Sequence, residues 1–174
     1  MSKYTKQTNT QTDTLYNNIL LLSRNKLFYT KFDLIDTFQN RINLIFIHIS
    51  FIFMKINQNS ENKKHKSFYQ KMFDLIFKKI ELNMRELGYG DTTVNTKMKI
   101  LVKTFYNILL SCENYKSRSL QNKYSFLLKY LSQNIDKNTT VDTGLVTYFD
   151  KYQTFCFDLN SDSVLRGDLN FNYK

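Results

Sequence analysis

Two histidines and a few carboxylates are the residues of this sequence whose types could carry metal or acid–base chemistry. His48 interrupts an apolar segment, and no Cys, Asp or Glu stands three or four residues away to complete a metal-binding pair. His65 stands among lysines in a polar segment, where a solvated side chain is the simplest interpretation. Asp33 and Asp36 are three residues apart, but no histidine near them completes an acid–base pair, so helix capping or ion pairing is expected. We therefore predict a buried, hydrogen-bonded His48, no metal site and no catalytic residue.

Two other patterns also favour a structural interpretation over a chemical one. The segment GYG (residues 88–90) is superficially similar to a phosphate-binding loop, but it follows a predicted helix rather than a strand and lacks the Lys-Ser/Thr pair. It predicts a turn between two helices, with Gly88 at a positive φ. Cys112 and Cys156 form neither a disulfide framework nor a CxxC motif, and both are expected to be buried. The protein is predicted not to be an enzyme and to need no cofactor.

The elements that must position these residues are predicted to be helices. The 174-residue chain contains no proline and only four glycines, which disfavours barrels, sandwiches and glycine-rich loops. Apolar residues recur at helical spacing along most of the chain, and helices are predicted over about residues 15–29, 37–56, 68–87, 98–112, 120–135 and 141–159. Asp36 or Thr37 is expected to cap the second helix, which is apolar nearly all round and therefore central. The sequence predicts an all-α, single-domain bundle of about six helices over residues 15–171, preceded by a flexible polar tail, residues 1–14.

The chain is basic, with 25 Lys and Arg against 15 Asp and Glu, a net charge of 25 − 15 = +10. Lys63, Lys64 and Lys66 form the densest basic patch, which ribosomal RNA or an anionic membrane could bind, whereas DNA is not an expected partner. The abundance of Lys, Asn and Ile is also what AT-rich codons supply, so the charge need not mark a binding surface. The longest apolar stretch, residues 42–56, is too short to span a bilayer, and the first residues lack the apolar core of a signal peptide. A cytoplasmic protein is expected.

Several motifs, taken in their order, resemble those of the ubiquinol–cytochrome c chaperone family, the assembly factors of the cytochrome bc1 complex. The most specific is RELGYGD (residues 85–91) followed by KMK (residues 97–99), which resembles the central signature of the family. Further matches to the family pattern are QKMFD (residues 70–74) and, upstream, Asp36, Thr37, Arg41 and His48. The sequence departs from the pattern at Asn40, where the family usually has Gly, and at Asn95, where Pro is common. The resemblance runs from about residue 15 to residue 171.

This resemblance implies an all-α fold without catalysis, in a protein that holds newly made cytochrome b before the bc1 complex forms. It also implies a peripheral place at the inner membrane, on the cytoplasmic face in a bacterium or in the mitochondrion of a eukaryote. The partners that it implies are cytochrome b or a bc1 precursor, a small helical co-chaperone, and the ribosome or an anionic membrane surface. The residues that match the signature are the candidate site residues: Asp36, Thr37, Arg41, His48, Asp74, Arg85, Glu86, Gly88, Gly90, Asp91 and Lys97.

Two roles stay open for the charged members of this set. They could bind a client, or they could form a buried polar network that joins the helices through Arg41, Asp74, Arg85, Glu86 and Asp91. A surface that holds a membrane protein also needs adaptable apolar side chains, which the 12 Tyr could provide, together with Met54, Met72, Met84 and Met98. Most of the Phe and Met are nevertheless expected in the core. The alternative function is that of a basic helical module that binds RNA, the ribosome or an anionic membrane.

Overall fold

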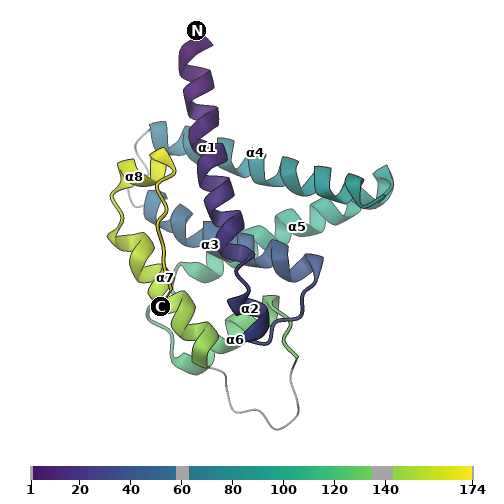
Figure 1. The fold of residues 1–174 in the computed structure, drawn as a ribbon, viewed down its shortest axis with the longest axis vertical. Coiled ribbons are helices and arrows are strands. Elements are labelled where there is room, and N and C mark those ends of the chain that lie inside the picture. The colour runs from purple at the N-terminus through teal and green to yellow at the C-terminus, as the bar shows by residue number, and fades with distance from the viewer. Residues whose placement is uncertain (1, 58–62, 135–142, 174) are drawn as a thin grey trace.

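Eight helices make up the part of the chain that the computed structural model describes, which is residues 2–57, 63–134 and 143–173 (Figure 1). They are α1 (Ser2–Ser23), α2 (Leu27–Thr30), α3 (Phe38–Asn57), α4 (Lys63–Glu86), α5 (Asp91–Cys112), α6 (Leu120–Tyr130), α7 (Thr143–Asp158) and α8 (Ser161–Arg166). Within these ranges no β-strand occurs, and the only strand-like pairing is a single bridge between Leu34 and Gln133. The predicted all-α bundle is confirmed, with six long helices and the two short helices α2 and α8.

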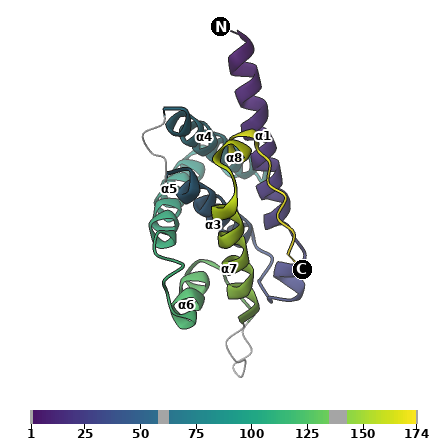
Figure 2. The ribbon, with the colours of Figure 1, turned by 90° about the vertical axis from the view of Figure 1, so that its left-hand side faces the viewer.

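Helix α3 is the centre of the bundle, as its nearly continuous apolar sequence predicts. Every residue from 42 to 53 is buried, because α3 contacts α1, α4, α5, α7 and α8. Figure 2 shows α3 between α5 on one side and α1 on the other. A helix with no polar face is stable in water only when neighbours cover it on all sides, so the other helices are arranged around α3.

Aromatic side chains fill the space between α3 and its neighbours in two groups. On the α7 side, His48 packs edge-on against Phe28, Tyr148 and Tyr152, with ring centroids 4.7–5.9 Å apart. On the α4–α5 side, the ring of Phe105 is packed against Phe46, Phe53, Phe73 and Phe77 at 5.3–6.0 Å. Such edge-to-face pairs add to the energy of simple burial, so most phenylalanines serve the core, as expected.

Side-chain hydrogen bonds mark several of the helix boundaries. Thr37, one of the two predicted caps, accepts a hydrogen bond from the Asn40 N–H at 3.1 Å and starts α3. The predicted helix 15–29 is wrong as one element: α1 ends at Ser23, and the Asn25 side chain accepts from the Leu27 N–H at 3.0 Å, which starts the separate helix α2. Segment 143–158 forms α7, so the helical interpretation of this weaker pattern is confirmed. Residues 2–14 lie within α1, and the flexibility of segment 1–14 stays a prediction.

The predicted helix 120–135 is shorter in the structure because Asn40 holds the chain that follows it. Helix α6 ends at Tyr130, and Leu131 is extended. The buried Asn40 side chain donates to the carbonyls of Ile35 and Ser132, at 2.7 and 2.8 Å, and accepts from the Ser132 N–H at 2.9 Å. These bonds replace the hydrogen bonds that a continued helix would make. Ile135, the predicted end of the helix, lies outside the described residues.

The segment after α8 runs back along α1. Gly167 has a φ of 83°, and a Cβ on it would lie 2.9 Å from the Gln11 carbonyl oxygen, so glycine is required for this approach. The Asn18 side chain donates to the Gly167 carbonyl at 2.9 Å. Beyond it, the rings of Phe171 and Tyr173 pack against Tyr148 at 5.5 and 5.1 Å. Residues 167–173 therefore cover both α1 and the aromatic group around His48.

Candidate functional site

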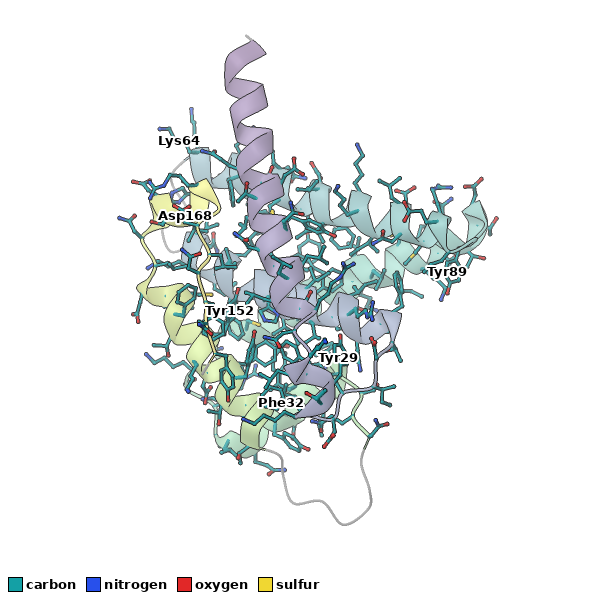
Figure 3. The ribbon with its side chains drawn as sticks, viewed as in Figure 1. Tyr29, Phe32, Lys64, Tyr89, Tyr152 and Asp168 are labelled. Carbon is teal, nitrogen blue, oxygen red and sulfur yellow. The ribbon has the colours of Figure 1, made fainter. Side chains whose placement is uncertain are left out.

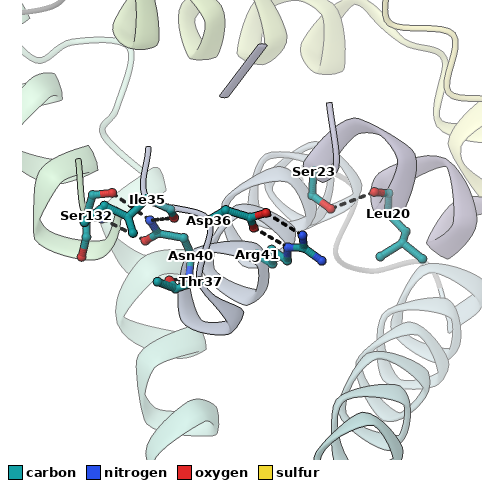
Figure 4. A network of polar contacts seen from close by, with 8 residues as sticks. All are labelled: Leu20, Ser23, Ile35, Asp36, Thr37, Asn40, Arg41 and Ser132. Carbon is teal, nitrogen blue, oxygen red and sulfur yellow. Dashed lines mark hydrogen bonds and ion pairs between the residues drawn. The ribbon is translucent and has the colours of Figure 1, made fainter. Parts of the chain in front are cut away.

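The first group of predicted site residues lies at the start of α3. Arg41 donates from Nε and Nη2 to the two carboxylate oxygens of Asp36, at 2.6 and 2.8 Å (Figure 4). The hydrogen bond from Arg41 lowers the pKa of the Asp36 carboxyl. Both side chains are about half exposed, so solvent screens the pair. Together with the Thr37 cap, the pair orders the first turn of α3 at the surface.

The second group forms the turn between α4 and α5. Arg85 donates to Glu81, one turn earlier on α4, and to Asp91, the first residue of α5. The hydrogen bonds to Asp91 and to Glu81 raise the pKa of the Arg85 guanidinium. Gly88 takes the left-handed conformation that the sequence predicts, with a φ of 85°, and Gly90 is the N-cap of α5. The signature residues therefore fix how α4 joins α5.

The remaining signature residues lie along the same two helices. Lys97 lies over the ring of Tyr89, with Nζ 5.4 Å from the centroid. Asp74 accepts a hydrogen bond from Gln70 at 2.8 Å on the outside of α4. Glu86 is exposed at the end of α4. Figure 3 shows Tyr89 at the far end of the α4–α5 hairpin, away from the rest of the bundle.

The hypothesis of one buried polar network is wrong. Its five members, Arg41, Asp74, Arg85, Glu86 and Asp91, are all exposed, and Arg85–Asp91 is the one ion pair among them in the described part of the chain. Arg85, Glu86 and Asp91 lie at the α4–α5 turn, which projects from the bundle (Figure 1) and leaves its charges in water. Arg41 lies at the start of α3 and Asp74 on the outer side of α4, so neither reaches that turn. The signature shapes an exposed hairpin and does not join the core helices.

His48, by contrast, is a core residue. Its Nδ1 lies 2.7 Å from the Leu44 carbonyl and its Nε2 lies 2.8 Å from the Tyr148 hydroxyl, so Nδ1 donates and Nε2 accepts. Burial lowers the pKa of His48 to about 4, which keeps the ring neutral at physiological pH. The prediction of a buried, hydrogen-bonded histidine is confirmed. Because no atom of His48 is exposed, it cannot contact another molecule, and it contributes only to the stability of the fold.

The solvated position predicted for His65 is wrong. The side chain is buried between the end of α3 and the start of α4, with Nδ1 3.3 Å from the Ile56 carbonyl oxygen. The lysines beside it in sequence, Lys63, Lys64 and Lys66, are exposed on the first turn of α4, as the helix turns them outward. Figure 3 shows Lys64 at the end of α4 opposite Tyr89. The basic patch thus lies at one end of the hairpin and the signature at the other.

An apolar hollow of about 450 Å³ lies between α3, α4 and α5. Its walls are mainly aromatic and aliphatic, made by Phe53, Met54, Tyr69, Tyr106, Leu109 and Leu110, and its rim carries Lys66 and Glu113. The ring centroids of Tyr69 and Phe53 lie 4.1 Å apart. Burial of Tyr69 and, in second place, the nearby Tyr106 raise the pKa of the Tyr69 hydroxyl to about 12. The Tyr69 hydroxyl is therefore neutral at physiological pH.

A second hollow continues along the same two helices. It measures about 570 Å³ and is lined by Glu81 of α4 and by Met98, Lys99 and Val102 of α5. The two hollows lie on the same side of the helix pair because their α5 residues are separated by whole helical turns. We call the two hollows together the α4–α5 groove. Its span along α5, from residue 95 to residue 113, is about 27 Å at the helical rise per residue.

Sequence reasoning missed most of the groove, although a signal for it was present. Tyr106 and Leu110 stand on the side of α5 away from its buried stripe, and both are exposed. Large apolar residues outside the core stripe of an amphipathic helix are such a signal. Of the four methionines considered for an adaptable surface, Met54 and Met98 line the groove, whereas Met72 and Met84 are buried in the core.

Two further features bear on the kinds of site that the described residues form. They contain no group of three or more His, Cys, Asp or Glu side chains that could hold a metal ion. None of their helices combines the length and apolarity needed to cross a bilayer.

Cys112 and Cys156 are both buried and unpaired, as predicted, and burial raises the pKa of each thiol.

Comparison with known proteins gives the fold and the family. The crystal structure of the Cbp3 homologue from Brucella abortus matches with a TM-score of 0.82 and 21% sequence identity, covering 98% of this chain and 93% of that one. At this identity the likeness shows a shared fold. No curated protein matches the sequence. The sequence model of the ubiquinol-cytochrome C chaperone family matches residues 30–171, which is most of the chain. This protein therefore belongs to the ubiquinol-cytochrome C chaperone family.

Proposed function

We propose that this protein is a non-enzymatic chaperone of cytochrome bc1 assembly whose client is newly made cytochrome b. Membership of the family supports a chaperone role in the assembly of this complex. In this proposal the α4–α5 groove holds an apolar segment of the client until the segment enters the complex. A peripheral place at the cytoplasmic face of the inner membrane and a small helical co-chaperone are further parts of the proposal, because the family resemblance implies them.

The observation that carries the proposal is the apolar lining of the α4–α5 groove. Tyr69 and Tyr106 combine apolar rings with polar tips, so they can line a recess that must stay soluble when it is empty. Met54 and Met98 add flexible thioether chains that can adjust to different apolar side chains. At roughly 25 cal/mol per Å² of apolar surface removed from water, a client segment seated here gains affinity without any covalent step.

The test uses a matched pair of leucines. Leu110 is 61% exposed and lines the groove, whereas Leu120 is 50% exposed and lies on α6, outside it. The tagged full chain, wild type or with Leu110→Ser or Leu120→Ser, is recovered from solubilised membranes of the native host, and bound proteins are quantified by mass spectrometry. Circular dichroism first establishes that both variants are folded.

The proposal expects cytochrome b to be enriched with the wild type and with Leu120→Ser, and to be reduced severalfold with Leu110→Ser. Absence of cytochrome b from all three samples would refute the client assignment. Equal enrichment with both variants would refute the groove as its binding site.

A second candidate function rests on Lys63, Lys64 and Lys66. These side chains are exposed together on the first turn of α4, where a helix disfavours cations, so an anionic partner there would gain energy. The partner would be ribosomal RNA or an anionic membrane.

Sedimentation with anionic vesicles, and separately with ribosomes, would measure this binding at several salt concentrations. Replacing the three lysines by alanine should weaken binding, whereas the same change at the exposed Lys26, Lys31 and Lys116 should not. Binding that is insensitive to salt and to both sets of changes would exclude this candidate.

A further inference from the structure

Helix α5 carries exposed apolar side chains on the side away from its buried face. Its buried residues, among them Leu101, Phe105 and Ile108, form the face toward the core. On the opposite side Ile100 and Leu110 are 60% and 61% exposed. Figure 2 shows α5 at the outer edge of the bundle, on the side away from α1. Large apolar side chains that stay exposed on a helix whose other face is already buried mark a candidate contact with another molecule.

The spacing of the outward residues is that of a helix–helix seam. Ile100, Lys103, Asn107 and Leu110 follow one another at intervals of three and four, so they form a narrow line along the helix. Ile100 and Leu110 end this line, about 15 Å apart at the helical rise per residue. Tyr106, 44% exposed, lies beside its middle.

This line is complementary to itself when two α5 helices pack antiparallel. With a two-fold axis beside residue 105, Ile100 of each copy meets Leu110 of the other, and Lys103 meets Asn107. Lys99 and Glu113, which flank the line on one side, then approach each other across the interface. Neither of these two charges makes an ion pair with another described residue. In an interface with two-fold symmetry, each of these contacts forms twice.

We propose that the outer face of α5 is the docking surface for a second copy of this chain, with the two α5 helices antiparallel. The other occupant to be considered is an anionic membrane, since Lys99 and Lys103 stand on this face. A line whose apolar members are Ile100 and Leu110, with Lys103 and Asn107 between them, lacks the broad apolar face of a membrane-surface helix. Glu113, at the end of the line, would be repelled by anionic lipid, whereas a second copy offers it Lys99.

The pairing has a consequence for the α4–α5 groove. Leu110 and Tyr106 belong both to the outer face of α5 and to the wall of the 450 Å³ hollow. Ile100 of the second copy therefore sits at the mouth of that hollow and shields its apolar lining from water. If the groove holds the client, as proposed above, client and second copy compete for it. The self-association itself does not depend on the identity of the client.

Sedimentation velocity of the purified full chain over a wide concentration range tests the proposal. The wild type is expected to show reversible monomer–dimer exchange. Lys99→Glu and Glu113→Lys each place like charges opposite each other twice, and each should weaken the dimer about tenfold. The double variant restores opposite charges and should return the dissociation constant to within about threefold of the wild type. Lys26→Glu, which changes an exposed lysine outside the face, is the control for net charge and should have less effect than Lys99→Glu.

Three outcomes would overturn the proposal. The wild type could be monomeric at every concentration, or both single reversals could associate as the wild type does, or the folded double variant could fail to recover. A monomeric wild type that floats with anionic vesicles, and loses this with Lys99→Glu, would assign the face to membrane instead. Loss of cytochrome b recovery in the pull-down would leave these results unchanged, so the two proposals fail independently.

Discussion

Protonation of His48 should destabilise the fold as the pH falls, because its ring is buried with no acceptor for a second proton. Nδ1 already donates to the Leu44 carbonyl, and Nε2 accepts from the Tyr148 hydroxyl. A proton on Nε2 would remove that acceptor and put a charge into an aromatic surrounding that contains no carboxylate partner among the contacts of the ring. Burial accordingly lowers the pKa of His48 to about 4 in the folded protein, against 6.5 for the free side chain.

The size and sign of the effect follow from these two values. Above pH 6.5 the ring is neutral in both states and contributes no pH dependence. Between pH 6.5 and pH 4 the unfolded chain binds a proton that the folded chain does not, so the free energy of unfolding falls as the pH falls. The full difference is about 3 kcal/mol at about 1.4 kcal/mol per pH unit, and about 2 kcal/mol of it is lost between pH 7 and pH 5. Below pH 4 both states are protonated and the loss levels off.

Urea denaturation of the wild type and of His48→Gln, each at pH 7 and pH 5, measures this quantity. Glutamine cannot titrate in this range, and all carboxylates contribute equally to both proteins, so the difference between the two pH dependences isolates His48. The wild type should lose about 2 kcal/mol more than the variant between pH 7 and pH 5. Equal losses in the two proteins, or an NMR titration of the His48 ring near pH 6.5 in the folded state, would refute the reasoning.

Three further substitutions test the fold. Asn40→Ala removes three hydrogen bonds from a buried site and should lower the free energy of unfolding by about 2–4 kcal/mol. Asn17→Ala, on the exposed side of α1, is the control and should change the free energy of unfolding little. Equal effects of the two substitutions in urea denaturation would contradict this account. Gly167→Ala should cost about 2 kcal/mol or more, because its φ is positive and α1 lies too close, while Gly90→Ala, with open space around it, should cost less than about 1 kcal/mol. Arg41→Ala breaks an exposed ion pair and should shift the midpoint of thermal unfolding by less than about 3 °C; a larger shift would restore a structural role for the pair.

The long helices could be predicted from the sequence because each carries its own periodic signal. The apolar stripes of α4 and α5 and the continuous apolar run of α3 determine both their extents and their buried faces. The turn at Gly88 was equally predictable, since a helix end of this kind favours glycine. These features depend on neighbours in sequence alone.

Features that depend on contacts between distant segments could not be predicted in this way. The end of α6 is set by the hydrogen bonds between Asn40 and Ser132, which are 92 positions apart, and no pattern within residues 120–135 indicates it. The burial of His65 depends on the end of α3 lying across it, although the lysines around it indicate solvent. The α4–α5 groove likewise requires knowing which two helices pack together. The charged signature residues were assigned to a possible buried network because their sequence does not reveal that the α4–α5 hairpin projects from the bundle.

The closure of residues 167–173 over α1 has a consequence for how the protein is made. Asn18 and Gly167, which hold the two segments together, are 149 positions apart. During synthesis α1 leaves the ribosome long before Gly167 is translated, so the part of α1 that residues 167–173 cover stays uncovered until that segment is made. The α4–α5 hairpin needs only local contacts and can form early. Docking of residues 167–173 on α1 therefore has to wait for their translation, and a nascent chain stalled before Gly167 would itself expose the kind of surface that chaperones bind.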